Sequence, residues 1–348
     1  MKAEIVAVFS AWMCLNVGLN YYNKYVLSMT AFRYPFFLTV GNKTIGLIVA
    51  VVLMKARSGL PDPLTLLAHF RRPIVHLQGL FTALNIGLNN WSLLLITLTL
   101  NQVLKSTTPL PTALLSVLLE GKRFSWQLYG SMLVLVVGCV LAAWGGFGSE
   151  KYWGVAVCVA SVLSSAAWTV LSAILMQAGE KPLDAVSLLF VSGPTCIFTL
   201  LCFFAAIDLP RLLDSGAGAG SEQKPAAGLI VLLIAVSALL ASLYDIVHNQ
   251  FVKLTSSMNM AIMGNAKLAL LVLLSMATLE STPTPLRIVG VVVSFLAVVW
   301  CAPTGQRAGP HAHQPRSVRR LTSCMPSKVA PGDDIPGEAF TPQAYKTP

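Results

Sequence analysis

Long apolar segments separated by short polar loops make up most of this chain. From Ile5 to Cys301 each segment is about 20 residues long, which is the length an α-helix needs to cross the hydrocarbon core of a bilayer. The pattern therefore predicts an all-α polytopic membrane protein. The ten predicted transmembrane helices lie at about 5–27, 34–55, 74–96, 99–119, 126–146, 152–176, 184–206, 226–250, 257–279 and 284–302.

Two segments fall outside this pattern. Asp214 to Ala226, DSGAGAGSEQKPA, is rich in Gly and Ser and predicts a flexible connection. The tail, residues 303–348, is rich in Pro, Gly, Arg and His and has no apolar periodicity, so we expect it to be disordered.

Two of the predicted spans contain the same order of residues. Lys105 precedes an apolar run that ends at Glu120, and Lys267 precedes an apolar run that ends at Glu280. The spacing, 267 − 105 = 162 residues, is about half of the membrane region and predicts two repeats. Because each repeat would hold five spans, an odd number, the second must be inverted, an architecture typical of secondary transporters. The predicted repeats are residues 1–150 and 151–302.

The composition agrees with a membrane protein. Of the 348 residues 55% are hydrophobic and 11% are charged, whereas a soluble protein carries about 25% charged residues. The mean hydropathy is +0.71. A net charge of +10 would suggest nucleic acid as the partner of a soluble protein, but here the charge lies in loops and the tail, and we expect no nucleic-acid partner.

The basic residues indicate the orientation. Ten spans place both termini on one side of the membrane, and the loops and tail of that side hold Lys2, Lys55, Arg57, Arg71, Arg72, Lys122, Arg123, Lys181, Lys253, Arg307, Arg316, Arg319 and Arg320. The opposite loops hold Lys24, Arg33, Lys151, Arg211, Lys224 and Arg287. Since cytoplasmic loops carry the excess of Lys and Arg, both termini are predicted to be cytosolic.

Catalytic chemistry has little support in the sequence. There is no Ser-His-Asp order, no paired intramembrane carboxylates and no metal-spaced cluster among the five histidines. The seven cysteines form no CxxC pair, and His311 and His313 lie in the predicted disordered tail. The sequence therefore favours a protein that is not an enzyme and that holds no metal or cofactor.

Lys105 and Lys267 are the main candidates for a binding site. An ammonium group inside a bilayer costs about 2.5–3.5 kcal/mol on insertion scales, so such a lysine usually faces a cavity and has a partner. Two of them would hold an anion such as a phosphate or diphosphate. The alternative is that each lysine extends to the interface. Ser106, Thr107 and Thr108 follow Lys105, offer hydroxyl donors, and precede a proline that predicts a helix break exposing backbone groups.

Other polar residues at membrane depth fit two interpretations. Lys43 would either line the cavity or form a structural ion pair. A set of amide, carboxylate and phenol side chains would either form hydrogen bonds between helices or recognise sugar hydroxyls and base edges, and Tyr244 could also stack on a ring. This set consists of Asn85, Asn89, Asn90, Tyr244, Asp245, Asn249 and Asn265.

Several motifs resemble the triose-phosphate and nucleotide-sugar translocator family of the drug/metabolite transporter superfamily. They are WMCLNVGLNYYNKYVL with the following FRYP, LNIGLNNWSL, NQVLKSTTPLPTALLSVLLEGKRFSW, YGSMLVLVVGCVLAAW, GNAKLALLVLLS and TPTPLRIVGVVVSFLAVVW. The resemblance covers about residues 5–302. It implies a ten-helix antiporter of inverted repeats that exchanges phosphorylated metabolites.

The resemblance also implies roles for individual residues. Lys105 and Lys267 match the family's two phosphate-binding lysines, and Tyr244 falls at, or within one residue of, its phosphate-binding tyrosine. The plastid carriers have an arginine after the second lysine, where this chain has Leu268, and a histidine in the third helix, which LNIGLNNWSL lacks. The motif GNAK is similar to the lysine motifs of Golgi nucleotide-sugar carriers, which would place Asn265 and Lys267 beside the substrate.

The leading hypothesis is therefore a Golgi or ER antiporter that exchanges a nucleotide sugar for a nucleoside monophosphate by alternating access. A sugar phosphate/inorganic phosphate exchanger, for example in a plastid envelope, is the second hypothesis. A non-transporting membrane scaffold that binds lipid or a partner through its basic tail is the third. The base, the sugar and the oligomeric state, a homodimer included, stay open.

Overall fold

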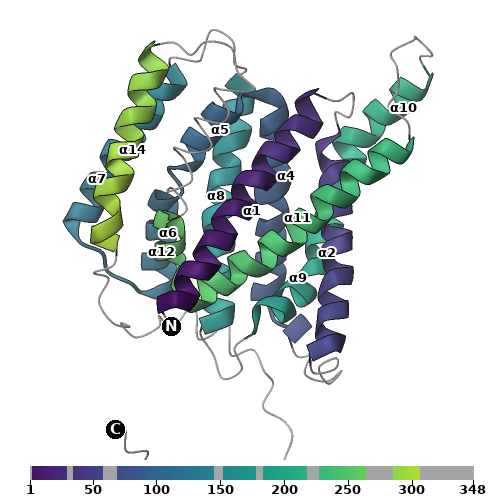
Figure 1. Ribbon diagram of the computed structural model, residues 1–348, viewed down its shortest axis with the longest axis horizontal. Helices are drawn as coiled ribbons and strands as arrows, with labels where there is room; N and C mark the ends of the chain where they lie inside the picture. The colour runs from purple at the N-terminus through teal and green to yellow at the C-terminus, as the bar shows by residue number, and fades with distance from the viewer. Residues whose placement is uncertain are drawn as a thin grey trace, which may run out of the picture.

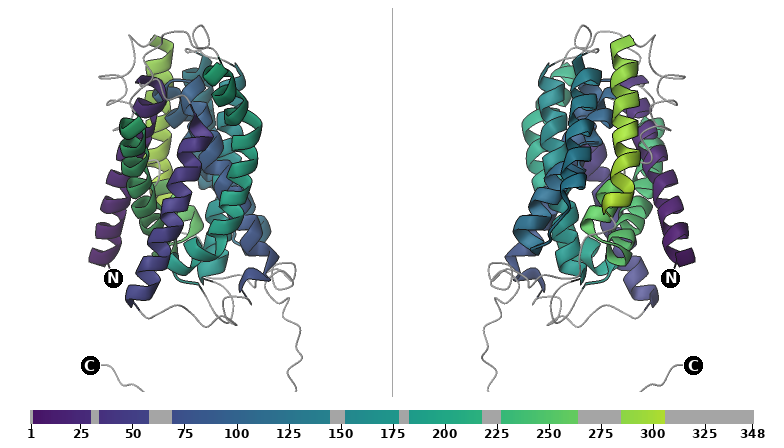
Figure 2. Two further views of the ribbon diagram at one scale, coloured as in Figure 1. Left: turned by 90° about the vertical axis from the view of Figure 1, so that its right-hand side faces the viewer. Right: turned by 90° about the vertical axis from the view of Figure 1, so that its left-hand side faces the viewer.

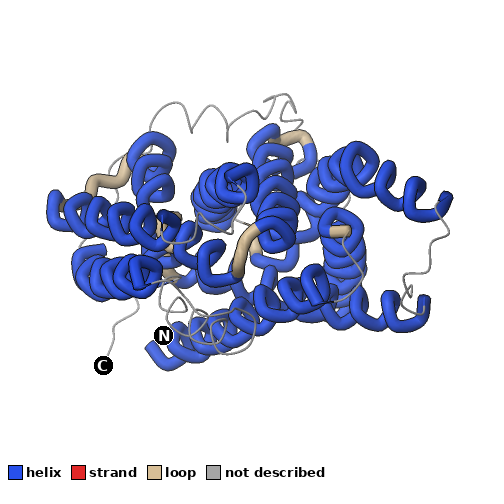
Figure 3. Tube along the Cα trace, turned by 90° about the horizontal axis from the view of Figure 1, so that it is seen from above, coloured by secondary structure: helices blue, strands red, loops and turns tan. Residues whose placement is uncertain are grey.

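The fold is a bundle of helices. The computed structural model describes residues 2–29, 34–57, 69–144, 152–177, 183–217, 227–263 and 285–305, and these ranges contain no strand (Figure 3). The helices run in roughly the same direction, and α11 crosses the others obliquely (Figures 1 and 2). They are α1 (Lys2–Met29), α2 (Pro35–Arg57), α4 (Pro73–Leu95), α5 (Leu98–Lys105), α6 (Pro109–Leu115), α7 (Trp126–Trp144), α8 (Tyr152–Gln177), α9 (Ala185–Phe203), α10 (Leu209–Ala217), α11 (Ala227–Leu254), α12 (Ser257–Met263) and α14 (Pro285–Gly305). Two π-helical turns, η1 (Ser116–Glu120) and η2 (Phe204–Asp208), extend α6 and α9.

The predicted all-α membrane fold is confirmed. Each predicted span coincides with helical residues, although residues 264–279 of the ninth span lie outside the described ranges. Five helices of the described chain are long and apolar enough to cross a membrane, at Glu4–Ser28, Pro35–Ala56, Tyr152–Gln177, Ala185–Leu213 and Gly228–Leu254. α4 is 23 residues long, but it carries Gln78, Asn85, Asn89 and Asn90 on its buried side, which lowers its hydropathy.

Two predicted boundaries are wrong. The flexible connection was placed from Asp214, but the seventh span continues through η2 into α10 and remains helical to Ala217. Leu209, Leu212 and Leu213 carry the apolar helical spacing past the expected end. The tail was expected to be disordered from Pro303, but α14 includes residues 303–305. Pro303 has no backbone N–H, so α14 continues to Gly305 without the hydrogen bond that this residue would otherwise donate.

The fourth span is broken, as the Thr-Pro sequence predicted. α5 ends at Lys105, residues 106–108 form a turn, and α6 begins at Pro109. The span ends in η1, and Gly121 follows with φ 69°, a left-handed conformation that glycine adopts without a steric penalty. The two halves of this span can therefore pack against different neighbours.

The pairing of helices fits the predicted repeats. α7 packs on α14, α2 on α9, α4 on α8, and α1 on α11; Figure 1 shows α7 and α14 together at one edge of the bundle. In the predicted repeats α7 corresponds to α14, α2 to α9, α1 to α8 and α4 to α11. The pairs α7–α14 and α2–α9 therefore join corresponding helices. The pair α4–α8 in one repeat order corresponds to the pair α11–α1 in the other. An inverted repeat requires this pattern, but the repeat and its boundaries stay predictions.

Glycines allow close approach between the helices. A Cβ atom at Gly138 of α7 would lie 2.6 Å from the backbone N of Ser294 in α14. At Gly79 of α4 it would lie 2.7 Å from the carbonyl oxygen of Ser192 in α9. Small residues serve this purpose at helix contacts in membranes, where close packing and not exclusion of water holds helices together.

A carboxylate from the second half of the chain caps the start of α2. The first backbone N–H groups of a helix have no partner within it. Asp208 Oδ2 of η2 accepts hydrogen bonds from the N–H groups of Phe36 at 2.8 Å and Phe37 at 2.9 Å. The contact joins residues 172 positions apart and holds α2 against the end of α9.

Replacing Asp208 with alanine should therefore destabilise the protein. We expect the free energy of unfolding to fall by about 1.5–3 kcal/mol, the range for hydrogen bonds to a charged group. Asp208→Asn keeps an acceptor oxygen and should lose less. Thermal denaturation of the purified protein in detergent checks the order of the midpoints, and equal midpoints for the alanine and asparagine variants would contradict the capping role.

Candidate functional site

The candidate site is a cavity near the centre of the bundle, lined by residues from both halves of the chain. Its lining comes from α1, α2, α4, α5, α8, α11 and α12, together with the break between α5 and α6. The charged lining residues are Lys43, Lys105 and Asp245. The amide side chains are Asn16, Asn20, Asn23, Asn42, Asn85, Asn89, Asn90 and Gln102. The rings are those of Trp12, Trp168, Tyr244 and His248.

Lys105 reaches the cavity from the last position of α5. α5 is fixed on α4 by the amide of Asn101, whose Nδ2 donates to Ser92 Oγ at 2.7 Å and to Asn89 Oδ1 at 3.3 Å. The ion pairs among the described residues are Lys43–Asp245 and Lys122–Glu120, so Lys105 has no carboxylate partner among them. A half-buried lysine that faces a cavity without such a partner can bind an anion.

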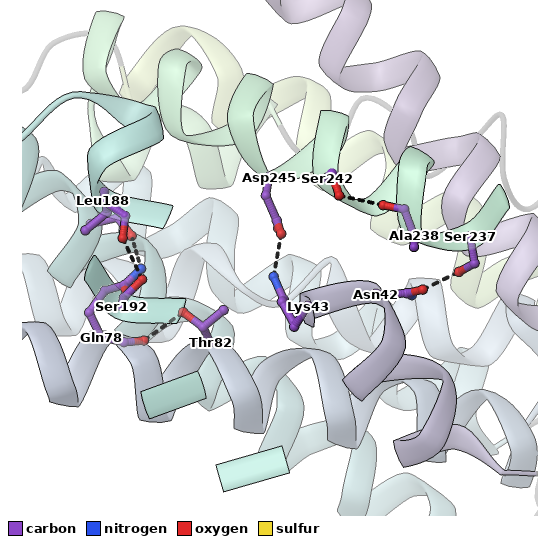
Figure 4. A network of polar contacts seen from close by, with 11 residues as sticks. Asn42, Lys43, Gln78, Thr82, Leu188, Ser192, Ser237, Ala238, Ser242 and Asp245 are labelled. Atoms are coloured by element: carbon purple, nitrogen blue, oxygen red, sulfur yellow. Dashed lines mark hydrogen bonds and ion pairs between the residues drawn. The ribbon is translucent and has the colours of Figure 1, made fainter. Parts of the chain in front are cut away.

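Lys43 fits both interpretations of its position. Its Nζ forms an ion pair with Asp245 Oδ2, and both side chains line the cavity. Figure 4 shows the two side chains pointing toward each other from α2 and α11. The positive charge of Lys43 is therefore balanced by a neighbour, whereas Lys105 has no carboxylate partner within the described ranges.

Asn90 belongs to a chain of amide and hydroxyl groups that joins four helices. It accepts from Asn23 Nδ2 at 3.2 Å and donates to Thr39 Oγ1 at 2.8 Å. Ser237 Oγ donates to Asn23 Oδ1 at 2.9 Å and accepts from Asn42 Nδ2 at 2.9 Å. These bonds between helices hold α1, α2, α4 and α11 together, and they leave the edges of the same amides on the cavity wall.

The rings form one continuous part of the wall. Trp168 stacks on His248 with 4.0 Å between ring centroids and 11° between planes. Tyr244 lies 5.7 Å from His248 and 6.4 Å from Trp12, measured between centroids. A planar or apolar part of a ligand would find its contacts here.

The hydroxyl groups predicted as donors to a substrate already donate hydrogen bonds to backbone carbonyls. Thr107 Oγ1 donates to the carbonyl oxygen of Leu104 at 2.7 Å, and Thr108 Oγ1 donates to that of Lys105. Ser106 Oγ donates to the carbonyl oxygen of Val103 at 2.6 Å. Ser106 and Thr108 line the cavity, but Thr107 is not among its lining residues. The carbonyl oxygens of Val103, Leu104 and Lys105 also accept backbone N–H bonds from residues 106–108, so the hydroxyls add a second bond to each carbonyl of the turn. Their role toward a substrate stays a prediction.

Lys267 and Asn265 lie outside the described residues, and their predicted roles are unchanged. Of the other predicted site residues, Lys105, Lys43, Tyr244 and Asn90 come together at the cavity. Sequence reasoning missed Trp12, Trp168, His248 and Gln102. Helical spacing could have found some of them, since Trp12, Asn16 and Asn20 recur every four residues in α1, and Tyr244 and His248 in α11.

A second polar cluster joins the two halves of the chain at the end of the bundle where α1 begins (Figure 1). Ser257, the first residue of α12, donates to Glu120 Oε2 at 2.7 Å, and its Oγ lies 3.1 Å from that of Ser116. Lys122 Nζ donates to Glu120 Oε1 at 2.9 Å. These hydrogen bonds hold the end of the fourth span against the start of the ninth. In the predicted orientation this contact lies on the cytoplasmic side.

An all-helical membrane bundle with a polar, partly cationic cavity at its centre is the architecture of a membrane transporter. The model of the Triose-phosphate Transporter family matches residues 3–300. The chain therefore belongs to this family, and the predicted resemblance is confirmed.

Curated relatives include both kinds of carrier that the sequence suggested. An Arabidopsis thaliana protein named "Probable sugar phosphate/phosphate translocator" is 26% identical over 304 residues, covering 87% of this chain and 83% of that protein. UDP-uronic acid transporter 1 of the same organism is 26% identical, covering 87% and 96%. UDP-galactose transporter 1, also from that organism, is 25% identical, covering 79% of each.

The fold has a counterpart among solved structures. A crystal structure of another protein superposes with a TM-score of 0.54 at 18% sequence identity, covering 85% of this chain and 98% of that chain. At this identity the likeness supports the fold alone.

Proposed function

We propose that the protein is an antiporter that exchanges a nucleotide sugar for a nucleoside monophosphate by alternating access around the central cavity. The observation that carries this proposal is the composition of the cavity wall, where eight amides and four rings surround one lysine without a carboxylate partner among the described residues. Lys105 would hold phosphate oxygens, and the amides and rings would contact the sugar and the base.

A compact sugar phosphate would make fewer contacts with the amides and rings of this wall than a nucleotide sugar would. Most of its binding would come from the phosphate group, so its affinity would depend on the number of cations that contact that group. In this cavity one of the two described lysines is neutralised by Asp245, and Leu268 stands where the plastid carriers have arginine. The names of two relatives, transporters of UDP-uronic acid and UDP-galactose, agree with the nucleotide-sugar proposal.

Exchange follows from the electrostatics of the site. An empty cavity would leave Lys105 and Lys267 without an anion, and their mutual repulsion would disfavour the change between inward-open and outward-open states. Either substrate would neutralise them. The carrier would then cross loaded in both directions, in the membrane of the Golgi or ER and with both termini in the cytosol.

The second candidate is a sugar phosphate/inorganic phosphate exchanger, favoured by the names of several relatives, which are called probable sugar phosphate/phosphate translocators. Counter-exchange in proteoliposomes separates the two. Purified protein is reconstituted with internal nucleoside monophosphates or inorganic phosphate, and uptake of labelled nucleotide sugars and sugar phosphates is measured.

We expect uptake of one nucleotide sugar to be driven by the nucleoside monophosphate of the same base and not by inorganic phosphate. Vesicles without protein, given the same gradients, provide the control. Uptake of sugar phosphates driven by inorganic phosphate alone would refute the nucleotide-sugar proposal and support the second candidate.

A further inference from the structure

Asp245 is an unexpected residue in a cavity that would bind an anion. Its carboxylate lines the same space as Lys105, where a negative charge repels a phosphate group. The side chains of Asp245 and Lys43 are only 5% and 4% exposed, and they form an ion pair with each other. Burying two charges costs free energy that their attraction often fails to recover, so such a pair is weak evidence for a purely stabilising role.

The backbone holds this pair at a close contact between α2 and α11. On one side of Lys43, a Cβ atom at Gly41 would lie 2.8 Å from Ile234 Cγ2, and on the other a Cβ at Gly46 would lie 3.3 Å from Ser242 Oγ. Next to the pair, Asn42 Nδ2 donates to Ser237 Oγ at 2.9 Å (Figure 4). Neither helix can withdraw here without losing these contacts, so Lys43 stays within reach of Asp245.

The pair changes the charge that a ligand meets. Among the described lining residues the formal charges are those of Lys43, Lys105 and Asp245. With Lys43 paired, Lys105 provides their net positive charge. Among these described residues, a ligand that binds mainly through a phosphate group would meet one cation without a carboxylate partner and a nearby carboxylate. A ligand that also carries a base and a sugar would gain additional contacts from the amides and rings.

We propose that Asp245 is a specificity-determining residue. By neutralising Lys43 it weakens the binding of anions, such as inorganic phosphate, that can contact the cavity only through a phosphate group. The inference rests on the proposed function, because it explains how the site would prefer nucleotides to inorganic phosphate. In this role Lys43 is a charge-balancing partner of Asp245 and does not hold the phosphate of the substrate.

The test is an equilibrium binding measurement on the purified full-length protein, with inorganic phosphate and a series of nucleoside monophosphates as probes. Asp245→Asn frees Lys43 and should tighten phosphate binding at least about tenfold, with a smaller change for the nucleotides. Lys43→Gln leaves the carboxylate unpaired and should weaken phosphate binding at least about tenfold. In the double variant K43Q/D245N both charges are gone, and the phosphate affinity should return to within about threefold of the wild type.

Asp184→Asn is the matched control. Asp184 caps the start of α9 through the N–H groups of Val186 and Ser187, outside the cavity lining, and an asparagine can still accept these bonds. Its phosphate affinity should equal that of the wild type.

Opposite shifts in the single variants and recovery in the double variant support the proposal. Equal phosphate affinity in D245N and the wild type overturns it. Where D245N fails to fold, K43Q and the double variant decide: weaker phosphate binding by folded K43Q with wild-type affinity in the double variant supports the proposal, and wild-type affinity in folded K43Q overturns it. Phosphate binding is measured without transport, so a failure of nucleotide-sugar exchange in the wild type would be seen separately.

Discussion

Replacing Lys105 with alanine is expected to abolish most of the exchange activity. Truncating one member of a buried, hydrogen-bonded charge pair costs about 2–5 kcal/mol, and here the missing partner would be a substrate phosphate. Expressed as transport efficiency, this is a loss of about 30-fold to several thousand-fold. Initial rates of counter-exchange by the purified variant measure the loss.

The control for this prediction is Lys253→Ala. Lys253 is also a lysine near the end of a helix, but it is exposed and does not line the cavity, so this variant should transport like the wild type. Lys105→Arg keeps the charge but not the shape of the donor, and should recover part of the activity. Wild-type exchange by K105A, with an unchanged thermal transition, would show that Lys105 does not take part in substrate binding.

A disulfide between residues 116 and 257 is expected to stop exchange. The hydroxyl oxygens of Ser116 and Ser257 lie 3.1 Å apart, close enough for cysteines at these positions to meet the Cβ–Cβ separation of a disulfide, about 3.5–4.5 Å. Alternating access requires the cavity to open at each end in turn. A covalent bond between the fourth and ninth spans would hold this end closed.

Exchange by S116C/S257C should therefore disappear after oxidation and return after reduction, measured in the same proteoliposomes. S116C and S257C alone, treated identically, show any effect of the native cysteines, of which the chain has seven. A cross-linked protein that still exchanges at the uncross-linked rate would show that this contact does not open during transport.

The positions of the helices could be predicted from the sequence because they depend mainly on local runs of apolar residues. Apolar runs bounded by charged loops predicted the beginnings of α2, α7, α8 and α12 to within one residue. The break after Lys105 was also local, since Pro109 and Pro111 cannot supply backbone donors. The flexible connection was started too early because its Gly and Ser residues after Asp214 suggested a loop, whereas α10 remains helical to Ala217.

The site was only partly predictable because its contacts are not local. Lys43 and Asp245 are 202 residues apart, and no pattern within either span indicates the partner. Trp12 and Trp168 were missed because a tryptophan in an apolar run is ordinarily core or lipid contact, and only packing shows that these two face a cavity. The hydroxyl protons of Thr107 and Thr108 bind backbone carbonyls, a choice that depends on the geometry of the break.

The most direct test of the proposed antiport is the dependence of uptake on the internal substrate. Labelled nucleotide sugar is offered to proteoliposomes that contain wild-type protein and either the matching nucleoside monophosphate or buffer alone. Because an unloaded cavity would resist the change of state, uptake should be at least about tenfold faster into the loaded vesicles. Equal rates into loaded and empty vesicles would contradict obligatory exchange.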